Sequence, residues 1–336
     1  MDGLWFRAAL ALLVSSIMAA RAFRRKSVDL TGVAAAIPVM VIHMVAGYRF
    51  AVLLLVFFFT SSKFTRTGED KKREIDAEFK EGGQRNWRQV LANSAIASIL
   101  LVLLVMIRRG EDSCLDTEKS KVVTILMGGI VGHYACCNGD TWSSELGMLS
   151  ISQPRLITNL KTVCRGTNGG VTFDGLLAAA AAGFVIGLSF ILVGLITAEC
   201  TAAVAWKQLL VLPLAAFAGF CGSLIDSLIG ATLQFSGYCT VLKKVVAKPG
   251  PTVKKISGMN ILDNNAVNAV SALLTTLLTS MACMALDQNG FIEGKSWSCF
   301  FNNSPLCFIQ QVLEATLYQA FAFKSFFSSD PPLLFF

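Results

Sequence analysis

The chain has 336 residues, of which 54% are hydrophobic and only 15% are charged, and its formal net charge is +7. Several apolar stretches approach the roughly 20 residues that cross a bilayer, which excludes a soluble globular protein. The positive charge does not require nucleic acid, because basic residues also orient membrane spans and lie near anionic head groups or phosphates. We therefore expect an all-α fold, a polytopic bundle of membrane helices.

The apolar runs predict about eight spans. They cover residues 4–20, 30–47, 50–62, 88–107, 121–138, 172–197, 206–229 and 261–285. The third is short, which suggests a tilted or re-entrant segment. No basic region precedes the first span and no small-residue cleavage site stands out, so we expect a retained span or uncleaved signal anchor. Residues 1–286 form the predicted membrane domain, and residues 287–336 form a divergent, aromatic-rich C-terminal tail.

The basic residues predict an orientation for this bundle. Most of the 29 Lys and Arg residues fall within segments 21–26, 63–88, 155–165 and 243–255. If the N-terminus lies outside, eight spans place all four segments on the cytoplasmic side, as the positive-inside rule requires. Both termini are then outside. A secretory-pathway or plasma membrane is favoured over the plastid envelope, because the first span is poor in the Arg and Ser of a transit peptide.

Four acidic residues lie beside the apolar runs: Asp140, Glu145, Asp226 and Asp263. An ionisable side chain near a membrane span is a functional candidate, because its desolvation costs several kcal/mol unless it is paired or binds a cation. Carboxylates are also the ligands that Mg²⁺ prefers. We expect all four to serve as metal ligands and Asp140 and Asp226 to be catalytic.

Two of these acids have informative neighbours. Gly222 and Gly230 share a helical face with Asp226, so a closely packed helix would bury this acid. Asp263 fits a helix N-cap. A cap does not explain the polar residues that follow it in the predicted span, where each amide needs a partner; these are Asn264, Asn265 and Asn268.

Basic and glycine-rich segments supply candidate phosphate ligands. Arg85 stands beside an amide and an interfacial aromatic in the segment Gln84–Trp87, and its planar guanidinium suits phosphate. A glycine-rich turn before a helix can aim several backbone N–H groups at one anion, although an ordinary turn explains the same residues. The full predicted set is Arg85, Arg155, Lys161, Arg165, Gly166, Thr167, Asn168, Gly169 and Gly170.

Other conspicuous residues have simpler interpretations. The charge run Lys71–Lys80 is typical of a solvated linker, with a short helix that ends at Gly82–Gly83. His133 is typical of a hydrogen-bonding core histidine. Cysteines such as Cys200 lack metal-ligand spacing and are expected to be buried free thiols. Cys299 and Cys307 could form an external disulfide.

The acidic residues and the candidate phosphate ligands all fall at the predicted cytoplasmic ends of spans, which indicates one site. Acids for a hard divalent cation, bases for phosphates and adjoining apolar helices together describe phosphoryl transfer at a membrane surface. The predicted cofactors are Mg²⁺ and a nucleoside triphosphate donor. The predicted substrate is an isoprenoid or other lipid phosphate.

Six motifs in order resemble the eukaryotic transmembrane protein 19 family, also known as domain of unknown function 92, and most of all its plant glucose-responsive (PGR) members. They are GGQRNW, GDTWSSE, PRLITNLK, GTNGGVT, DSLIGATLQ and ILDNNAVN. The resemblance covers residues 1–286 and implies a multi-span helical membrane protein. A related plant branch is a phytyl-phosphate kinase, which implies metal and phosphate roles for the residues named above. Cys164 stands where the family usually has proline.

Two other functions stay open at this point. The resemblance to PGR proteins implies a non-enzymatic regulator of glucose response at the plasma membrane. A cation-coupled transporter would also need acids within its spans, but it requires them near the bilayer centre, whereas these acids are predicted at span ends. The substrate, the choice of ATP or CTP, and the oligomeric state do not follow from the sequence.

Overall fold

A computed structural model describes residues 2–108 and 112–288. Residues 289–336, which make up nearly all of the predicted tail and include Cys299 and Cys307, lie outside the described residues. The helices are α1 (Asp2–Arg24), α2 (Leu30–Ala46), α3 (Tyr48–Arg66), α4 (Glu69–Ile75), η1 (Glu81–Gly83), α5 (Trp87–Ala92), α6 (Ala95–Arg108), α7 (Thr117–Gly147), α8 (Phe173–Thr197), α9 (Ala202–Gln208), α10 (Val211–Leu233) and α11 (Asn264–Gln288). The strands are β1 (Arg155–Leu156), β2 (Gly170–Val171), β3 (Ser236–Cys239), β4 (Lys244–Val246) and β5 (Val253–Ser257).

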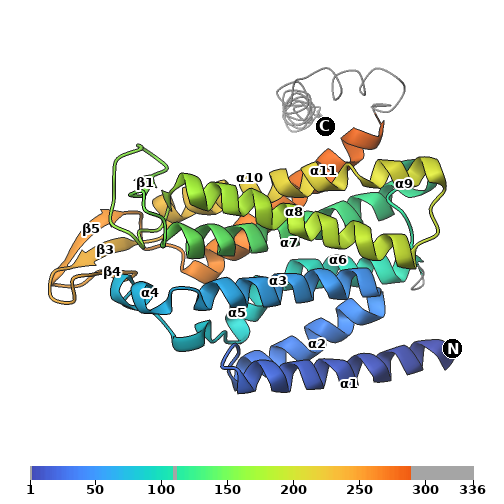
Figure 1. The fold of residues 1–336 in the computed structure, drawn as a ribbon, viewed down its shortest axis with the longest axis horizontal. Coiled ribbons are helices and arrows are strands. Elements are labelled where there is room, and N and C mark those ends of the chain that lie inside the picture. Colours follow the sequence, from blue (N-terminus) through green and yellow to red (C-terminus); the bar gives the residue numbers. More distant parts are fainter. Residues whose placement is uncertain (1, 109–111, 289–336) are drawn as a thin grey trace, which may run out of the picture.

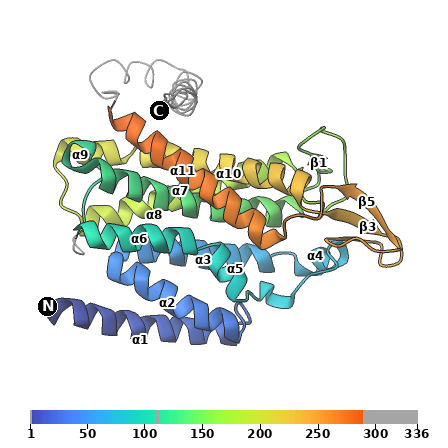
Figure 2. The same ribbon diagram turned by 180° about the vertical axis from the view of Figure 1, so that it is seen from behind.

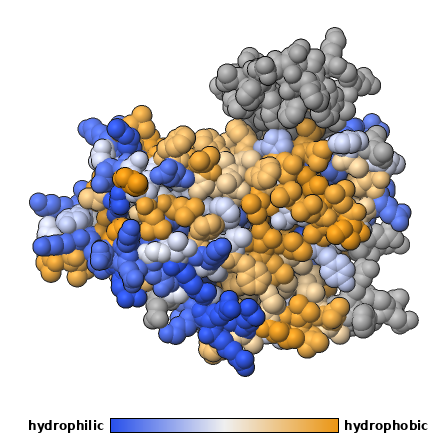
Figure 3. Space-filling model, in the orientation of Figure 1, coloured by the Kyte–Doolittle hydropathy of each residue, from blue (hydrophilic) through white to orange (hydrophobic). Residues whose placement is uncertain are grey.

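The long helices run back and forth between two ends of the molecule (Figures 1 and 2). One end carries α4 and all the strands, and the opposite end carries α9 and the start of α1. On the face shown in Figure 3, hydrophilic residues gather at the strand end and hydrophobic residues cover most of the rest. The polar segments that were predicted to be cytoplasmic therefore do lie together at one end.

Five helices in the described part of the chain are long and apolar enough to cross a membrane. They are Tyr48–Arg66, Thr117–Gly147, Phe173–Thr197, Val204–Leu233 and Asn264–Ala285. The apolar helices α2 and α6 are shorter. The predicted bundle of membrane helices is confirmed in this coarser form, while eight crossings are not established. The third predicted span is a full 19-residue helix, α3.

The predicted span 88–107 is wrong as a single helix, because the chain turns at Asn93 and Ser94 between α5 and α6. The Asn93 carbonyl accepts a hydrogen bond from His133 Nε2 at 3.0 Å instead of continuing the helical ladder. The predicted helix up to Gly82–Gly83 is also wrong. Helix α4 ends at Ile75, and Gly82 and Gly83 both adopt positive φ in a separate turn.

Small sheets at the polar end were not predicted. Strands β1 and β2 form an antiparallel pair, and β3 lies between β4 and β5 in an antiparallel sheet of three. They connect the ends of helices, so the fold is mostly helical rather than wholly so. The sheets form where the chain leaves the apolar helices, and they hold the loops between α7 and α8 and between α10 and α11.

Helix α7 forms the centre of the bundle, and its residues 126–139 are buried. Small residues let its neighbours approach closely. A Cβ on Gly132 would lie 2.4 Å from Thr279 of α11, and one on Gly139 would lie 2.6 Å from the Gly219 carbonyl of α10. This close contact places the polar residues near the end of α7 directly against α10 and α11.

Candidate functional site

Two acids on different helices meet near the polar end of the bundle. Asp140 of α7 and Asp226 of α10 lie next to each other, close enough for their carboxyl groups to interact. Gly222, one turn before Asp226, packs against Cys136 of α7, where an added Cβ would lie 2.6 Å from the sulfur. The sequence prediction that this glycine pattern buries Asp226 against a neighbouring helix is therefore confirmed.

Helix α11 completes the surroundings of this pair. Ser271 Oγ donates a hydrogen bond of 2.8 Å to Asp226 Oδ2, so three helices contribute oxygen atoms at one place. Ser271 is buried, at 1% exposure. A hydroxyl and two carboxyl groups are all hard oxygen ligands, the class that suits Mg²⁺ and other hard cations.

The pair lies deeper than the sequence analysis expected. Asp140 precedes the last residue of α7, Gly147, by two helical turns, and Asp226 precedes the last residue of α10, Leu233, by the same length. At 1.5 Å per residue this depth is roughly 10 Å. In the helical bundle the two acids therefore lie near the polar end, about two turns before their helices end.

A second polar cluster links α7 to α3 and α8. Asn138 is fully buried, and its Oδ1 accepts hydrogen bonds from Thr60 at 3.0 Å and Ser61 at 3.3 Å. Its Nδ2 donates to the Ala182 carbonyl at 3.2 Å. Trp142 Nε1 also donates to Thr60 Oγ1, at 3.2 Å. These contacts fix the rotation of α7, which in turn fixes the direction in which Asp140 points.

Glu145 has a basic partner that the sequence did not suggest. Lys72 Nζ of α4 lies 2.6 Å from Glu145 Oε2, and it also donates to the carbonyls of Phe64 and Thr65. Lys72 is only 1% exposed, so the interpretation of Lys71–Lys80 as a solvated linker is wrong at this residue. In this structure Glu145 therefore forms an ion pair with a buried lysine.

Arg85 lies close to this ion pair. Its Nη1 donates to Ser62 Oγ at 2.8 Å, and its guanidinium lies over the Phe58 ring. Enclosure by protein lowers the pKa of Arg85 from its ordinary value, and the charge of Glu145 opposes that shift. An arginine stays protonated under such a shift, so Arg85 brings a fixed positive charge to the polar end.

Asp263 does not join the acidic pair. It is exposed, and its Oδ1 accepts from the Ala266 N–H at 2.8 Å, as an N-cap of α11 does. Asn264 is also exposed, whereas Asn265 and Asn268 are half-buried. Among the described residues, no three His, Cys, Asp or Glu side chains are placed to hold one metal ion. Of the four predicted carboxylates, Asp140 and Asp226 are the two that the structure brings into contact.

The glycine-rich turn is a packing element here. The N–H groups of Thr167 and Gly170 donate within the turn, and that of Asn168 donates to Ser236 Oγ. Gly169 lies so close to α10 that an added Cβ would be 2.4 Å from Ala231. Most of its backbone donors are already used, so the turn does not form the row of anion-facing N–H groups that we expected. Gly166 is exposed at the surface.

The three basic residues around this turn lie in the loop between α7 and α8. Arg155 and Lys161 are exposed, and Arg155 Nη1 bonds to the Leu160 carbonyl. Arg165 Nη2 bonds to the Ile151 carbonyl at 3.0 Å. These bonds stabilise the loop itself. His133 behaves as expected for a core histidine, since it bonds to Asn93.

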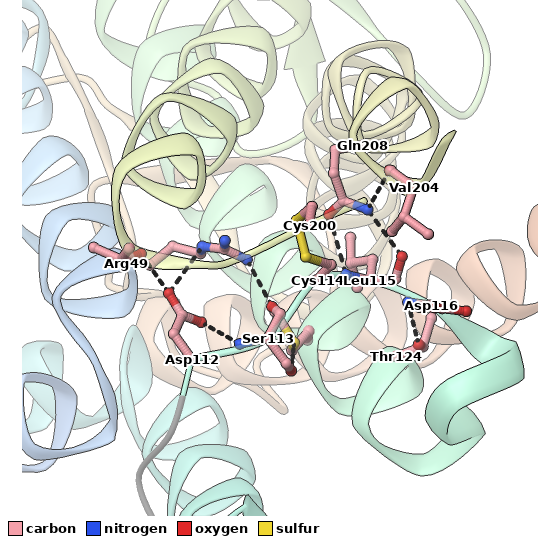
Figure 4. The surroundings of a disulfide bond; sticks show 12 residues. Arg49, Asp112, Ser113, Cys114, Leu115, Asp116, Thr124, Cys200, Val204 and Gln208 are labelled. Atoms are coloured by element: carbon pink, nitrogen blue, oxygen red, sulfur yellow. Dashed lines mark hydrogen bonds and ion pairs between the residues drawn. A yellow bond between two sulfur atoms is a disulfide. The ribbon is translucent and has the colours of Figure 1, made fainter. Parts of the chain in front are cut away.

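Cys200 is not a free thiol, contrary to expectation, because it forms a disulfide with Cys114 (Figure 4). The bond joins the α6–α7 loop to the α8–α9 loop at the end opposite the strands. Gln208 reinforces this connection through hydrogen bonds to both backbone groups of Leu115. The buried cysteines outside this disulfide, among the described residues, are Cys136, Cys137, Cys239 and Cys283. Burial was predicted for Cys136, Cys137 and Cys283.

Comparison with known proteins identifies the family. The family described as "Integral membrane protein DUF92" matches residues 13–276. The chain belongs to the DUF92 family of integral membrane proteins. It is 64% identical to Protein PGR of Arabidopsis thaliana over 277 residues, which is 82% of this chain and 96% of that protein. The family resemblance in the sequence motifs is therefore confirmed.

This DUF92 protein also has more distant relatives among uncharacterized membrane proteins. An uncharacterized membrane protein of Methanocaldococcus jannaschii is 28% identical over 229 residues, 68% of this chain and 83% of that protein. One from Synechocystis sp. is 31% identical over 195 residues, 58% of this chain and 67% of that protein. No solved structure matches the chain.

Sequence reasoning missed several residues of this DUF92 protein's polar end. Lys72 was hidden within a charge run, and Ser271 and Thr60 are hydroxyl residues in apolar helices with no motif of their own. Asn138 carried a usable signal: an amide within a span needs a partner, and it lies two residues before Asp140.

Proposed function

We propose that this DUF92 protein is a membrane phosphotransferase that extends a polyprenyl or other lipid monophosphate at its cytoplasmic end. The terminal phosphoryl group of a nucleoside triphosphate would pass to the lipid monophosphate, giving a lipid diphosphate and a nucleoside diphosphate. The contact between Asp140 and Asp226 carries this proposal. Two acids placed together inside an apolar bundle need a proton or a cation between them.

The donor set of the pair fits Mg²⁺, which commonly binds through one or two carboxylates and completes its coordination with water and substrate phosphates. Asp140 and Asp226 would hold the ion, with Ser271 orienting Asp226. A bound Mg²⁺ would neutralise charge on the transferring phosphoryl group.

The surrounding residues would position the reactants. Lys72 fixes Glu145, so the end of α7 keeps its place beside α4. Arg85 supplies a fixed positive charge at the polar end, which would attract a substrate phosphate. Asn138 holds the rotation of α7 through its bonds to α3 and α8. Each group orients or attracts charge, which is how proteins accelerate phosphoryl transfer.

The orientation proposed from the basic segments places the strand end in the cytosol. The Cys114–Cys200 disulfide then lies on the outer side, and disulfides persist in oxidising compartments. This agreement supports a secretory-pathway or plasma membrane.

The experiment uses purified full-length protein in detergent with prenyl monophosphates of several chain lengths and labelled ATP or CTP. We expect Asp140→Asn and Asp226→Asn to abolish diphosphate formation while the protein stays folded. Asp263→Asn is the matched control, because an asparagine keeps the helix cap and the residue lies outside the pair. Absence of product from folded wild-type protein at every chain length would refute the proposal.

Thermal unfolding tests metal binding separately from the transfer reaction. Mg²⁺ should raise the melting temperature of the wild-type protein in detergent and leave that of the Asp140→Asn variant unchanged. An equal rise in both proteins would contradict the assignment of the ion to this pair.

The depth of the pair favours a second candidate, a cation-coupled transporter. Acids roughly 10 Å inside the bundle could exchange a proton or cation during transport. Reconstituted vesicles would show Asp140-dependent cation flux without any diphosphate product. The similarity to Protein PGR leaves a non-enzymatic regulatory role as the third outcome. In that case the Asp140→Asn variant would still restore the sugar phenotype of a null mutant.

A further inference from the structure

A basic pocket at the polar end lies between α1 and α3, apart from the acidic pair. Its volume is about 320 Å³, and four cationic side chains contribute to its wall together with two serines and apolar residues. The cations are Arg21, Arg25, Lys63 and Arg66, and no acidic residue lines the pocket.

Three of these cations have no side-chain partner within the part of the chain that the structure describes. The structure shows no side-chain hydrogen bond or ion pair for Arg21, Arg25 or Lys63 with any described residue. Arg66 is held in place, because its Nη2 donates to the Arg25 carbonyl at 2.7 Å and to Ser27 Oγ at 2.6 Å. Arg21, Arg25 and Lys63 are exposed, so water solvates them in the free protein, and an anion that enters the pocket would meet four positive charges.

An apolar cleft of about 90 Å³ adjoins this pocket. The two cavities share the side chains of Met18, Ala22 and Phe58 in their walls, so they lie side by side, and we call the two together the hollow. The cleft extends between α1, α2, α3 and α5, where residues such as Val39 and Leu54 line it. Arg85 stands at the junction, since it lines the cleft and donates to Ser62 of the basic pocket.

We propose that this hollow binds a lipid with a phosphate head group. The phosphate lies among Arg21, Lys63 and Arg66, and the hydrocarbon chain enters the cleft beneath Phe58. Free phosphate would leave the apolar cleft unused, whereas a lipid anion matches both parts. The site stands at the end of the bundle that the basic residues place in the cytosol, where membrane leaflets are richest in anionic lipids.

The inference does not rest on the proposed transfer reaction. Binding to this hollow needs neither Asp140 nor Asp226, so a protein that binds the lipid without turnover would refute only the reaction.

The test measures binding of dioleoyl phosphatidic acid, dioleoyl phosphatidylcholine and inorganic phosphate to delipidated full-length protein by native mass spectrometry and by thermal shift. We expect tight binding of phosphatidic acid, at least ten-fold weaker binding of phosphatidylcholine, and weak binding of inorganic phosphate. Affinity for phosphatidic acid should fall as salt rises. Equal affinity for both lipids would overturn the proposal, and so would inorganic phosphate that binds as tightly as phosphatidic acid.

Two variants separate the parts of the site. The double variant R21Q/K63Q removes two cations that make no bond within the described chain, so the fold should survive, and phosphatidic acid binding should drop at least ten-fold. The matched control K254Q/K255Q removes two exposed charges of β5 and should bind as the wild type does. If both double variants bind equally well, the pocket is not the site.

The cleft is tested by A36F, which places a ring in its wall on α2. This variant should weaken phosphatidic acid binding and leave inorganic phosphate binding unchanged. The D140N variant should bind phosphatidic acid as the wild type does. Unchanged lipid binding by A36F would overturn the assignment of the chain to this cleft.

Discussion

The ion pair between Lys72 and Glu145 joins the polar segment α4 to the central helix, so its removal should loosen the whole polar end. At 2.6 Å the two charges attract by about 6 kcal/mol at an effective dielectric constant of about 20. Desolvation of both groups offsets much of this attraction. Removal of one partner leaves the other charge poorly compensated, which typically costs 3–5 kcal/mol, about the size we expect for Lys72→Met.

The double-mutant cycle separates the pair from its surroundings. Glu145→Met should cost less than Lys72→Met, because Lys72 keeps its bonds to the carbonyls of Phe64 and Thr65. The double variant should be more stable than the sum of the single losses predicts, with a coupling of about 2 kcal/mol or more. The measurement is unfolding of detergent-solubilised protein by SDS titration, followed by tryptophan fluorescence.

A matched control lies next to the buried lysine. Lys71 is exposed on the same helix and has no side-chain partner among the described residues, so Lys71→Met should change stability by less than about 0.5 kcal/mol. Additive losses in the cycle would refute the reasoning. So would a Lys72→Met variant as stable as Lys71→Met, since the contact would then contribute no free energy.

Three other predictions concern stability. Peptide mapping without reduction should recover Cys114 linked to Cys200, and free thiols at both sites would contradict the structure. Replacing both cysteines by serine should lower the free energy of unfolding by about 2–4 kcal/mol. Gly183→Ala should destabilise the bundle by about 1–3 kcal/mol in SDS titration, because an added Cβ would lie 2.1 Å from a carbonyl oxygen of α10. The control Gly230→Ala should cost little, since the nearest atom to its added Cβ lies 3.5 Å away. Asp263→Ala should lower the free energy of unfolding by about 1 kcal/mol, because a helix cap is lost, and should leave turnover unchanged. Loss of activity in this variant would show that Asp263 does belong to the metal site.

Hydropathy was a sufficient guide to where the chain forms helices, because an apolar run in a bilayer has few alternatives to a helix. It was insufficient where a tertiary contact competes with the helical ladder. The break at Asn93 depends on His133, which lies 40 residues away. The burial of Lys72 depends on α4 folding back onto α7, and no local pattern distinguishes this lysine from exposed Lys71.

The site residues show the same difference between features that are set locally and features that are set by tertiary contacts. Glycine spacing indicated which face of α10 carries Asp226, because packing of small residues is a local property. It could not indicate that the partner would be Asp140, since that depends on the rotation of α7 set by Asn138. The glycine-rich turn does not present the expected row of N–H groups, for a related reason. Its conformation was foreseeable from Gly169, but whether its N–H groups stay free depends on Ser236, which belongs to another part of the chain.

The contact between Asp140 and Asp226 constrains every functional hypothesis for this protein. Packing alone does not require it, because asparagine at either position would fill the same volume and would bring no second charge. Two carboxyl groups that touch inside an apolar bundle are stable together when a proton or a cation lies between them. The phosphotransferase, with its bound Mg²⁺, and the transporter, with its exchanged cation, each supply one. A purely regulatory protein would need a shared proton, and its function would then survive the change of either acid to asparagine.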